Sequence, residues 1–340
     1  MHKDITIYDL ARELKLSPAT ISRGLKDHQA INKNTKKRIV DKAEEMGYRF
    51  NTFASNLRKR KTNTIGVIIP RLNSYFVSNA IAAMEKIASE AGYNIIISQS
   101  MESMAKEEVN AKTMFDNRVD GLLVSLAYDT VSIEHFQRFI KRNIPVIFFD
   151  RVHESDDSVS VVIDNYKNAY DITSHLVQQG CTGIMHITGN LKRNVYRERF
   201  RGYKDALKDG GLDYDEERLI IGELNEEAGA VAAEKILAMK KLPDALFVSN
   251  DVCAASCMRV LKQSGIRIPE DIAIAGFNND PISRMVEPNI TTVNYPSYQM
   301  GEIAARHLIN HLKGTADIHS TNKIILKSEV LIRESTLKKK

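Results

Sequence analysis

Cysteine is scarce in this sequence, and long apolar runs are missing from it. Only three of the 340 residues are cysteines: Cys181 stands alone, and Cys253 and Cys257 lie four residues apart. Because no further Cys or nearby His completes a set of four ligands, we expect buried thiols, no metal and no other cofactor. No run reaches the roughly 18 apolar residues that span a bilayer, and the first residues form no apolar signal core. A cytoplasmic protein without a membrane segment is expected.

The motifs of several enzyme classes are also missing. The sequence contains no Gly-x-Gly-x-x-Gly, no Gly-Lys-Ser/Thr phosphate loop and no His-Glu-x-x-His. Asp150 with His153 or His186 leaves acid–base catalysis as an alternative, although solvated histidines explain these residues at least as well. We therefore do not expect an enzyme.

The sequence does have an uneven distribution of charge. Residues 1–62 hold 15 Lys and Arg against 7 Asp and Glu, a net charge of +8, whereas the remainder holds 33 against 36, a net charge of −3. A basic unit on a mildly acidic body is expected where one part of a protein meets phosphate. A basic tail that only keeps the chain soluble is less consistent, because residues 5–57 also have apolar periodicity and should fold. The length suits two or three domains.

Three short helices are predicted in the basic region. The first covers Ile7–Leu14, with Thr6 placed to cap it. The second covers Pro18–Leu25, because Ser17-Pro18 combines a capping residue with proline at the first helical position. The third begins at Asn34 or Thr35 and runs to residue 46, with these residues facing inward: Ile39, Val40 and Ala43. Two short helices joined by a few residues are typical of a helix-turn-helix.

The same residues resemble the headpiece of the lactose-repressor (LacI/GalR) family. The resemblance implies a helix-turn-helix domain over residues 1–50, whose second helix enters the major groove of double-stranded operator DNA. The matching motifs occur in the family's order: Thr6-Ile7-Tyr8-Asp9-Leu10-Ala11, Leu16-Ser17-Pro18-Ala19-Thr20-Ile21-Ser22-Arg23, Asn34-x-x-Lys37-Arg38-Ile39, Gly47-Tyr48 and Asn51-x-x-Ala54-x-x-Leu57.

The resemblance implies a role for individual residues of this headpiece. Pro18, Ala19 and Arg23 occupy the base-facing positions, and only Arg23 has the donors for a bidentate contact to guanine. Residues with hydroxyl groups would hold DNA phosphates, with ordinary helix capping as the alternative: Ser17, Thr20, Ser22, Thr35 and Tyr48.

A hinge helix and linker over residues 51–62 are implied next. Asn51, Ala54 and Leu57 would face the minor groove, with Leu57 as the apolar wedge between base pairs. So short a run is marginal as an isolated helix, and a flexible basic linker is the alternative. This chain has Phe50 where the family often has Pro, and Ser55 where Arg or Gln is more usual.

Residues 63–340 alternate apolar runs with amphipathic stretches, which indicates an α/β fold with parallel sheets. Strands are predicted at Ile65–Pro70, Asn94–Ser98, Gly121–Ser125, Pro145–Asp150, Val159–Asp164, Gly183–Thr188, Ala245–Ser249 and Ile272–Phe277. Helices are predicted at Asn79–Ala91, Ala169–Gln178, Arg201–Lys208, Ala228–Lys240 and Ala254–Ser264.

Further family motifs lie in this part of the chain: Gly66-Val67-Ile68-Ile69-Pro70, Phe149-Asp150-Arg151, Arg199-x-x-Gly202-Tyr203, Asn250-Asp251, Gly276-Phe277-Asn278 and Arg333-Glu334-Ser335-Thr336. The resemblance implies two lobes like those of periplasmic sugar-binding proteins, crossed by the chain near residues 161, 291 and 322. Lobe 1 would hold about 63–160 and 292–321, and lobe 2 about 162–290 and 323–340.

A small-molecule effector is expected between the lobes, because ligands of parallel sheets gather at the carboxyl ends of strands. The residues that the resemblance places there are Tyr75, Phe76, Ser125, Asp150, Arg199, Asn250 and Asn278. Each has another reading: Asp150 and Asn250 can cap loops or helices, the two aromatics can be core, and Arg199 can pair with Asp150. Asn278 stands where sugar-responsive relatives often have Asp, and Leu224 where some have a stacking aromatic.

The predicted function is a DNA-binding transcriptional regulator, expected to be a repressor, whose operator affinity a sugar-like effector controls. A homodimer is expected because one recognition helix covers only a half-site, and the tail has no leucine heptad for a tetramer. Replacing Arg199 should remove the effector response and leave folding near normal. A transport sugar receptor is the remaining alternative, although it would have no use for a basic headpiece.

Overall fold

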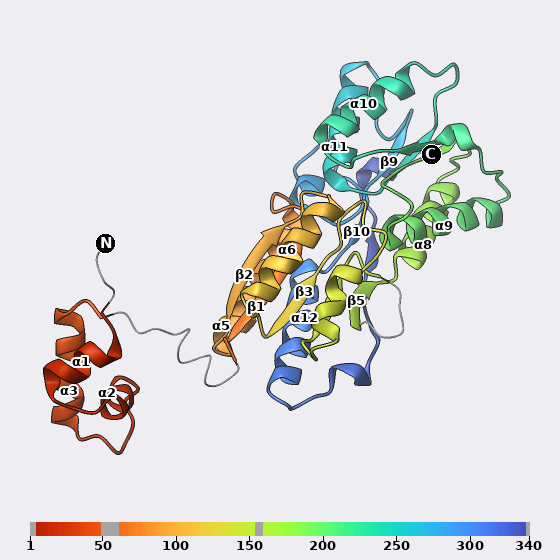
Figure 1. The fold of residues 1–340 in the computed structure, drawn as a ribbon. Helices are drawn as coiled ribbons and strands as arrows, with labels where there is room; N and C mark the ends of the chain where they lie inside the picture. The colour runs from red at the N-terminus through yellow and green to blue at the C-terminus, as the bar shows by residue number, and fades with distance from the viewer. Residues whose placement is uncertain (1–4, 49–60, 154–158, 338–340) are drawn as a thin grey trace. The chain divides into compact units, whose positions relative to one another are not determined.

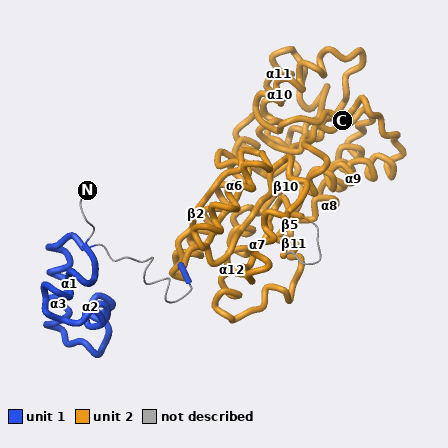
Figure 2. Tube along the Cα trace, viewed as in Figure 1, with its two compact units in different colours: residues 1–62 blue, residues 63–340 orange. Residues whose placement is uncertain are grey.

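The computed structural model describes residues 5–48, 61–153 and 159–337, which belong to two compact units. Unit 1 is residues 1–62 and unit 2 is residues 63–340 (Figure 2). Unit 1 is helical, and unit 2 is built from sheets with helices on both faces (Figure 1). This agrees with the predicted fold class.

Unit 1 contains the three predicted helices, α1 (Ile7–Leu14), α2 (Pro18–Leu25) and α3 (Lys33–Glu45). The bounds predicted for the first two are confirmed. The third begins earlier than predicted because the side chain of Asn32 accepts the Thr35 N–H at 2.8 Å and caps the helix. Val40 does not face inward as predicted, since it is 40% exposed. The core of this unit is small: Leu10, Ala11, Ile21, Ile39 and Ala43.

Lobe 1 of unit 2 is built on a six-stranded sheet whose strands are all parallel. Its order is β11 (Lys323–Leu326), β5 (Val159–Ile163), β4 (Val146–Phe149), β3 (Gly121–Val124), β1 (Thr64–Ile69) and β2 (Asn94–Gln99). Helices α5 (Tyr75–Glu90) and α12 (Ser297–Leu312) pack on one face of the sheet. The other face carries α6 (Met104–Asp116), a 3₁₀ turn (Glu134–Phe136) and α7 (Gln137–Ile140).

Lobe 2 is built on a four-stranded parallel sheet. Its order is β7 (Leu219–Ile221), β6 (Ile184–Thr188), β8 (Ala245–Val248) and β9 (Ala273–Ala275). Helices α8 (Asn165–Gln178) and α9 (Asn194–Asp209) lie side by side on one face, and α10 (Glu226–Leu237) and α11 (Asp251–Gln263) on the other (Figure 1). A two-stranded antiparallel ribbon, β10 (Thr292–Asn294) with β12 (Glu329–Leu331), lies where the chain crosses between the lobes.

The helices of lobe 1 come into close contact across a glycine. A Cβ added at Gly301 of α12 would lie 2.1 Å from the carbonyl oxygen of Ala80 in α5, so any larger residue would push the two helices apart. Strands β1, β3 and β4 inside the sheet are almost fully buried, as expected for a parallel sheet covered on both faces, whereas the edge strands β2 and β11 are partly exposed.

Two of the predicted crossing points are too early. The crossing predicted near residue 161 falls inside β5, which pairs with β4 in the sheet of lobe 1. The crossing predicted near 322 precedes β11, which pairs with β5, so residues 323–326 belong to lobe 1 and not to lobe 2. The physical reason is that each crossing segment completes a lobe 1 strand before it leaves that sheet.

Within residues 5–48, 61–153 and 159–337, no helix combines the length and the apolar character that a bilayer crossing requires. The same ranges contain no cluster of three or more His, Cys, Asp or Glu side chains arranged to hold a metal ion.

Candidate DNA-binding face and ligand cleft

Helix α2 has one buried and one exposed face. Ile21 and Gly24 are buried against the other two helices, and a Cβ added at Gly24 would lie only 2.4 Å from the Ile39 side chain. The three residues expected to read bases are all exposed on the other side: Pro18, Ala19 and Arg23. The described residues offer Arg23 no ion pair and no side-chain hydrogen bond, so its guanidinium is available to a partner outside the chain.

The hydroxyl residues expected at phosphates differ in their surroundings. Ser17 caps α2 by accepting the Thr20 N–H at 3.1 Å, and the two hydroxyl oxygens lie 2.8 Å apart. Capping is thus observed for Ser17, although it leaves the hydroxyl exposed. Thr20, Ser22, Thr35 and Tyr48 are half-buried. The expected hinge residues Asn51, Ala54 and Leu57 lie outside the described residues.

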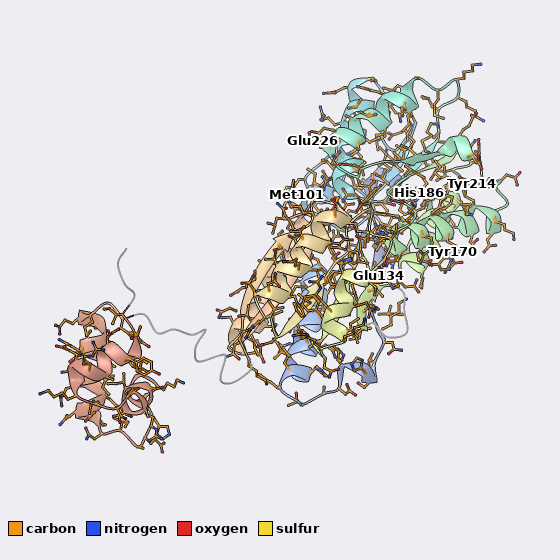
Figure 3. All side chains as sticks on the ribbon, in the orientation of Figure 1. Met101, Glu134, Tyr170, His186, Tyr214 and Glu226 are labelled. Atoms are coloured by element: carbon orange, nitrogen blue, oxygen red, sulfur yellow. The ribbon has the colours of Figure 1, made fainter. Side chains whose placement is uncertain are left out.

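Unit 2 contains a cleft of about 670 Å³ whose walls come from both lobes. Met101 and Glu226, both labelled in Figure 3, line it from lobe 1 and lobe 2 respectively. Six of the seven expected effector residues lie on its walls: Tyr75, Phe76, Asp150, Arg199, Asn250 and Asn278. Ser125 does not; it directly follows β3 and is fully buried, with its N–H donated to the Ile68 carbonyl at 2.9 Å. Leu224 lines the cleft as well.

The alternative readings of these residues are partly realised. Asn250 caps α11, since its side-chain oxygen accepts the N–H groups of Val252 and Cys253. Phe76 is buried and packs at 4.5 Å between ring centroids against Tyr295, whereas Tyr75 is 46% exposed. Capping and core packing therefore hold the walls of the cleft in place, and these roles are compatible with contact to a ligand.

Asp150 follows β4 in a left-handed backbone conformation, with φ of 58°. The Tyr295 hydroxyl donates to its Oδ1 at 2.7 Å, and the Asn194 amide donates to its main-chain carbonyl at 3.1 Å. Burial raises the pKa of the Asp150 carboxyl above its usual value. The residue joins three segments of chain and leaves one carboxylate oxygen for a ligand.

Arg199 lies deeper than the sequence indicates. Only 3% of its surface is exposed, its Nε donates to Asn165 Oδ1 at 2.9 Å, and its Nη1 donates to the Ser249 carbonyl at 2.9 Å. The guanidinium stacks over the Phe277 ring, 3.5 Å from the centroid. Burial lowers the pKa of Arg199. Its hydrogen bonds go to these neutral groups of lobe 2, and not to Asp150.

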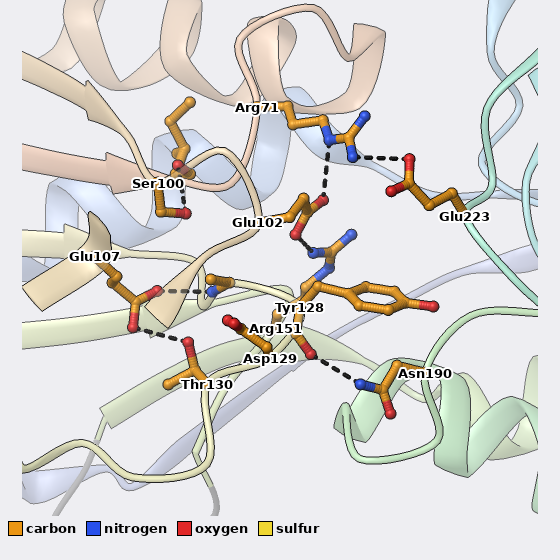
Figure 4. Close-up of polar contacts among 12 residues, drawn as sticks. Arg71, Ser100, Glu102, Glu107, Tyr128, Asp129, Thr130, Arg151, Asn190 and Glu223 are labelled. Atoms are coloured by element: carbon orange, nitrogen blue, oxygen red, sulfur yellow. Dashed lines mark hydrogen bonds and ion pairs between the residues drawn. The ribbon is translucent and has the colours of Figure 1, made fainter. Parts of the chain in front are cut away.

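A series of charged residues on the cleft walls links the two lobes (Figure 4). Glu102 accepts ion pairs from Arg71 at 3.6 Å and from Arg151 at 2.7 Å, all within lobe 1. Arg71 also reaches Glu223 of lobe 2 at 3.0 Å, and Arg151 donates to the Tyr196 hydroxyl of lobe 2 at 3.0 Å. The two lobes are therefore joined across the cleft by charge-assisted hydrogen bonds, which are stronger than neutral ones.

The loop after β3 adds neutral contacts between the lobes. The Tyr128 hydroxyl donates to the Gly222 carbonyl at 3.0 Å, and the Asn190 amide donates to the Tyr128 carbonyl at 3.1 Å. Glu107, fully buried, holds this loop by accepting the Ala127 N–H at 2.7 Å and the Thr130 hydroxyl at 3.0 Å (Figure 4). Burial raises the pKa of Tyr128 to about 12, so its phenol is protonated.

Several residues of the cleft were not predicted from the sequence, among them Arg71, Glu102, Tyr128, Tyr196, Asp280 and Tyr295. Most of these follow the end of a strand by a few residues, and that position is the signal that could have identified them. Tyr196 has no such signal, because it is the third residue of α9 and does not follow the end of a strand.

The geometry defines a class of protein. A small helix-turn-helix unit with one exposed polar face is joined to a two-lobed α/β unit whose polar cleft is bounded by both lobes. Residues 6–51 match the model of bacterial regulatory proteins of the lacI family, and residues 173–336 match that of a periplasmic-binding-protein-like domain.

Individual relatives agree with this class along the whole chain. Catabolite control protein A of Priestia megaterium is 32% identical over 98% of this chain and 99% of its own length. A solved complex of the transcriptional regulator CelR with cellobiose has a TM-score of 0.73 at 24% identity, covering 97% of this chain and 99% of that one. A lac repressor dimer bound to operator and an anti-inducer has a TM-score of 0.84 at 22% identity, covering 98% and 100%. The two structures show the fold.

The chain belongs to the lacI family of bacterial regulatory proteins. It is a DNA-binding transcriptional regulator under the control of a ligand, and it is not an enzyme.

Proposed function

We propose that this chain is an operator-binding repressor that acts as a homodimer and that a sugar or sugar derivative in the cleft controls its affinity for DNA. The headpiece would be residues 1–50, the hinge 51–62 and the sensor 63–340. The cleft is the observation that carries the proposal, because carboxylates, amides and aromatic rings from both lobes line one continuous space. Such a mixture suits a polyol, whose hydroxyls need donors and acceptors and whose ring carbons need an apolar face.

On the DNA side, α2 is the proposed recognition helix. Arg23 would read guanine from the major groove, with Pro18 and Ala19 in van der Waals contact with neighbouring bases. Ser17, Thr20, Ser22, Thr35 and Tyr48 would hold phosphates, which fixes the register without reading sequence. The lac repressor structure is described as a dimer bound to operator, and we carry that arrangement over to this chain as a proposal.

On the ligand side, a molecule that touches both walls would bind the closed arrangement of the lobes better than an open one. Ligand binding would then shift the balance between arrangements and, through the hinges of a dimer, the affinity for DNA. Cellobiose in the CelR complex supports a carbohydrate as the class of ligand.

The test begins with DNA selected from a random pool by the full chain. Fluorescence anisotropy then compares this DNA with random DNA for the full chain and for residues 63–340 alone. We expect tight, sequence-dependent binding by the full chain only. Selective binding by residues 63–340 alone would contradict the assigned headpiece.

The oligomeric state has a separate test. Sedimentation equilibrium should give a dimer, because two half-sites need two recognition helices. A stable tetramer at micromolar concentration would count against the proposal.

A further inference from the structure

Asp280, on the lobe 2 wall of the cleft, has a main chain that is held firmly in place. Its N–H donates to Asp251 Oδ2 at 2.8 Å, and its carbonyl accepts the Ser283 hydroxyl at 2.7 Å. Asp251 is itself fully buried and accepts the Thr292 hydroxyl at 2.7 Å. The main chain of Asp280 is therefore held at both its N–H and its carbonyl, which fixes the point from which the side chain leaves the backbone.

The carboxylate of Asp280 lacks the partners that a buried charge needs. Only 5% of the residue is exposed, and its Oδ1 has no hydrogen-bond partner among the described residues. Its Oδ2 has a single long contact, 3.5 Å from the Asn278 amide nitrogen. Burial raises the pKa of this carboxyl to about 6. A buried polar group without partners destabilises the fold, so its presence on a cleft wall points to a donor supplied from outside.

The charges around Asp280 indicate what kind of donor the cleft accepts. Three guanidiniums line the cleft: Arg71 and Arg151 pair with Glu102, whereas Arg199 is held by neutral acceptors. Other carboxylates of the walls have no ion pair within the described part of the chain: Asp150, Glu226 and Glu227. The lining thus carries six carboxylates (Glu102, Asp150, Glu223, Glu226, Glu227 and Asp280) against three guanidiniums, so an anion in the cleft would face an excess of negative charge.

We propose that Asp280 is a specificity-determining residue that accepts hydrogen bonds from hydroxyl or ammonium groups of an uncharged or amino sugar and discriminates against phosphorylated sugars. This inference rests on the proposed function, because it names the chemical class that the same cleft takes. A carboxylate oxygen can accept two donors at once, and a bond to an ammonium group is stronger than one to a hydroxyl.

A purely structural role and a ligand-binding role for Asp280 predict opposite changes in stability when the residue is replaced. A carboxylate that held the fold together would have partners, and its replacement would lower the melting temperature. If the group instead serves a ligand at a cost to the fold, Asp280→Asn should raise the melting temperature of the ligand-free protein at pH 7.5 by removing a buried charge. Asp280→Ser is the second variant, which removes the charge with a smaller side chain.

The binding experiment uses matched series of hexoses. Glucose, galactose and mannose, with the 2-amino derivative and the 6-phosphate of each, are titrated against the full-length protein by calorimetry. In at least one series the neutral or amino form should bind the wild type about tenfold or more tightly than the 6-phosphate. Asp280→Asn should reduce that ratio by about tenfold and weaken the amino form most. Asp213→Asn, an exposed carboxylate with the same change, is the matched control and should leave the ratio unchanged.

Two binding results would overturn this inference and leave the proposed function standing. One is a 6-phosphate that binds the wild type as tightly as its neutral form, and the other is a ratio of the two affinities that neither Asp280 variant changes. A fall in the melting temperature of both variants would likewise identify Asp280 as structural. If no sugar in any series binds, the proposed carbohydrate effector is itself contradicted, and the inference fails with it.

Discussion

The headpiece and the sensor unit contain arginines expected to contact a binding partner, in opposite surroundings. Arg23 is exposed on a short helix over a core of a few side chains, and nothing within the described residues restrains it. Arg199 is almost fully buried, with two hydrogen bonds and a stacked aromatic ring. The headpiece thus separates recognition from stability, whereas the sensor uses the same side chains for both.

The largest effect should come from Arg199→Ala. The substitution leaves Asn165 Oδ1 and the Ser249 carbonyl without their donor, and each orphaned acceptor costs about 1–3 kcal/mol. We expect the sensor unit to lose about 2–5 kcal/mol of unfolding free energy along with its effector response. Urea unfolding followed by circular dichroism measures this loss.

Arg201→Ala on the same helix is the matched control, because Arg201 is exposed and makes an ion pair with Glu198 and a cation–π contact with the Tyr166 ring. It should cost less than about 1 kcal/mol. The sequence alone predicts near-normal folding without Arg199, and equal stability of the two variants would restore that expectation.

The second effect concerns the headpiece. Arg23→Ala should reduce discrimination between operator and random DNA by about 1–3 kcal/mol per half-site, because bidentate contacts to guanine are lost. The melting temperature should stay unchanged, since the side chain is exposed. Anisotropy titrations at fixed salt measure the ratio of the two affinities.

Arg12→Ala, another exposed headpiece arginine, is the control. It should alter binding to both DNAs alike, if it alters binding at all. An unchanged ratio for Arg23→Ala would remove this residue from the base-reading set.

A third prediction uses His186, a buried histidine of lobe 2. His186 is fully buried in a stack with Tyr203 and Phe247, and burial lowers its pKa to about 3. Since the unfolded chain binds a proton near pH 6.5 and the folded one does not, stability falls as the pH drops below 6.5 towards 3. The loss from this group is about 1.4 kcal/mol per pH unit in that window.

Urea unfolding at pH 7 and pH 5 compares the wild type with His186→Phe, whose ring can join the same stack. The variant should lose less stability on acidification than the wild type. His28, in the headpiece, is exposed, so His28→Phe is the control and should keep the acid sensitivity of the sensor. Equal acid sensitivity in the wild type and His186→Phe would show that His186 is not its source.

The smallest effect should come from Glu102→Gln. Glu102 links Arg71 and Arg151 on the cleft wall, and partly exposed ion pairs contribute about 0–1 kcal/mol each. We expect faster amide hydrogen exchange in the contacting segments 127–130 and 222–225, and a smaller effect at high salt. Asp116→Asn removes an exposed ion pair with Lys112 in the same lobe and should leave these segments unchanged. Equal hydrogen exchange in the two variants would mean that the ion pairs of Glu102 do not hold the lobes together.

Local signals made much of the fold predictable. The bounds of α1 and α2 follow from Thr6, Ser17 and Pro18, because capping and proline act within one turn. The eight predicted strands are all present. Helices of the sensor begin earlier than predicted, as in α5, because Ser74 caps a first turn whose residues show no apolar period of their own.

Features that depend on distant parts of the chain could not be predicted. Strands β10, β11 and β12 are short and pair with partners far away in sequence, so no local pattern marks them. The position of Arg199 was predictable from its motif, but its burial was not. The groups that hold it are Asn165 at the start of α8 and Ser249 directly after β8, both distant in sequence. Asp280 was missed because its lack of partners is a property of the fold.

The sheet order of lobe 1 has a consequence for synthesis. This lobe begins with β1 near residue 64, yet its edge strand β11 ends at residue 326 and its helix α12 at residue 312. All four strands of the lobe 2 sheet have been made once residue 275 is complete. On the ribosome the later-starting lobe can therefore assemble its sheet first, while the apolar strands of the earlier one wait for their last partners. During that interval the nascent chain exposes apolar, aggregation-prone strands, which makes this stage of translation the one where a chaperone would matter most.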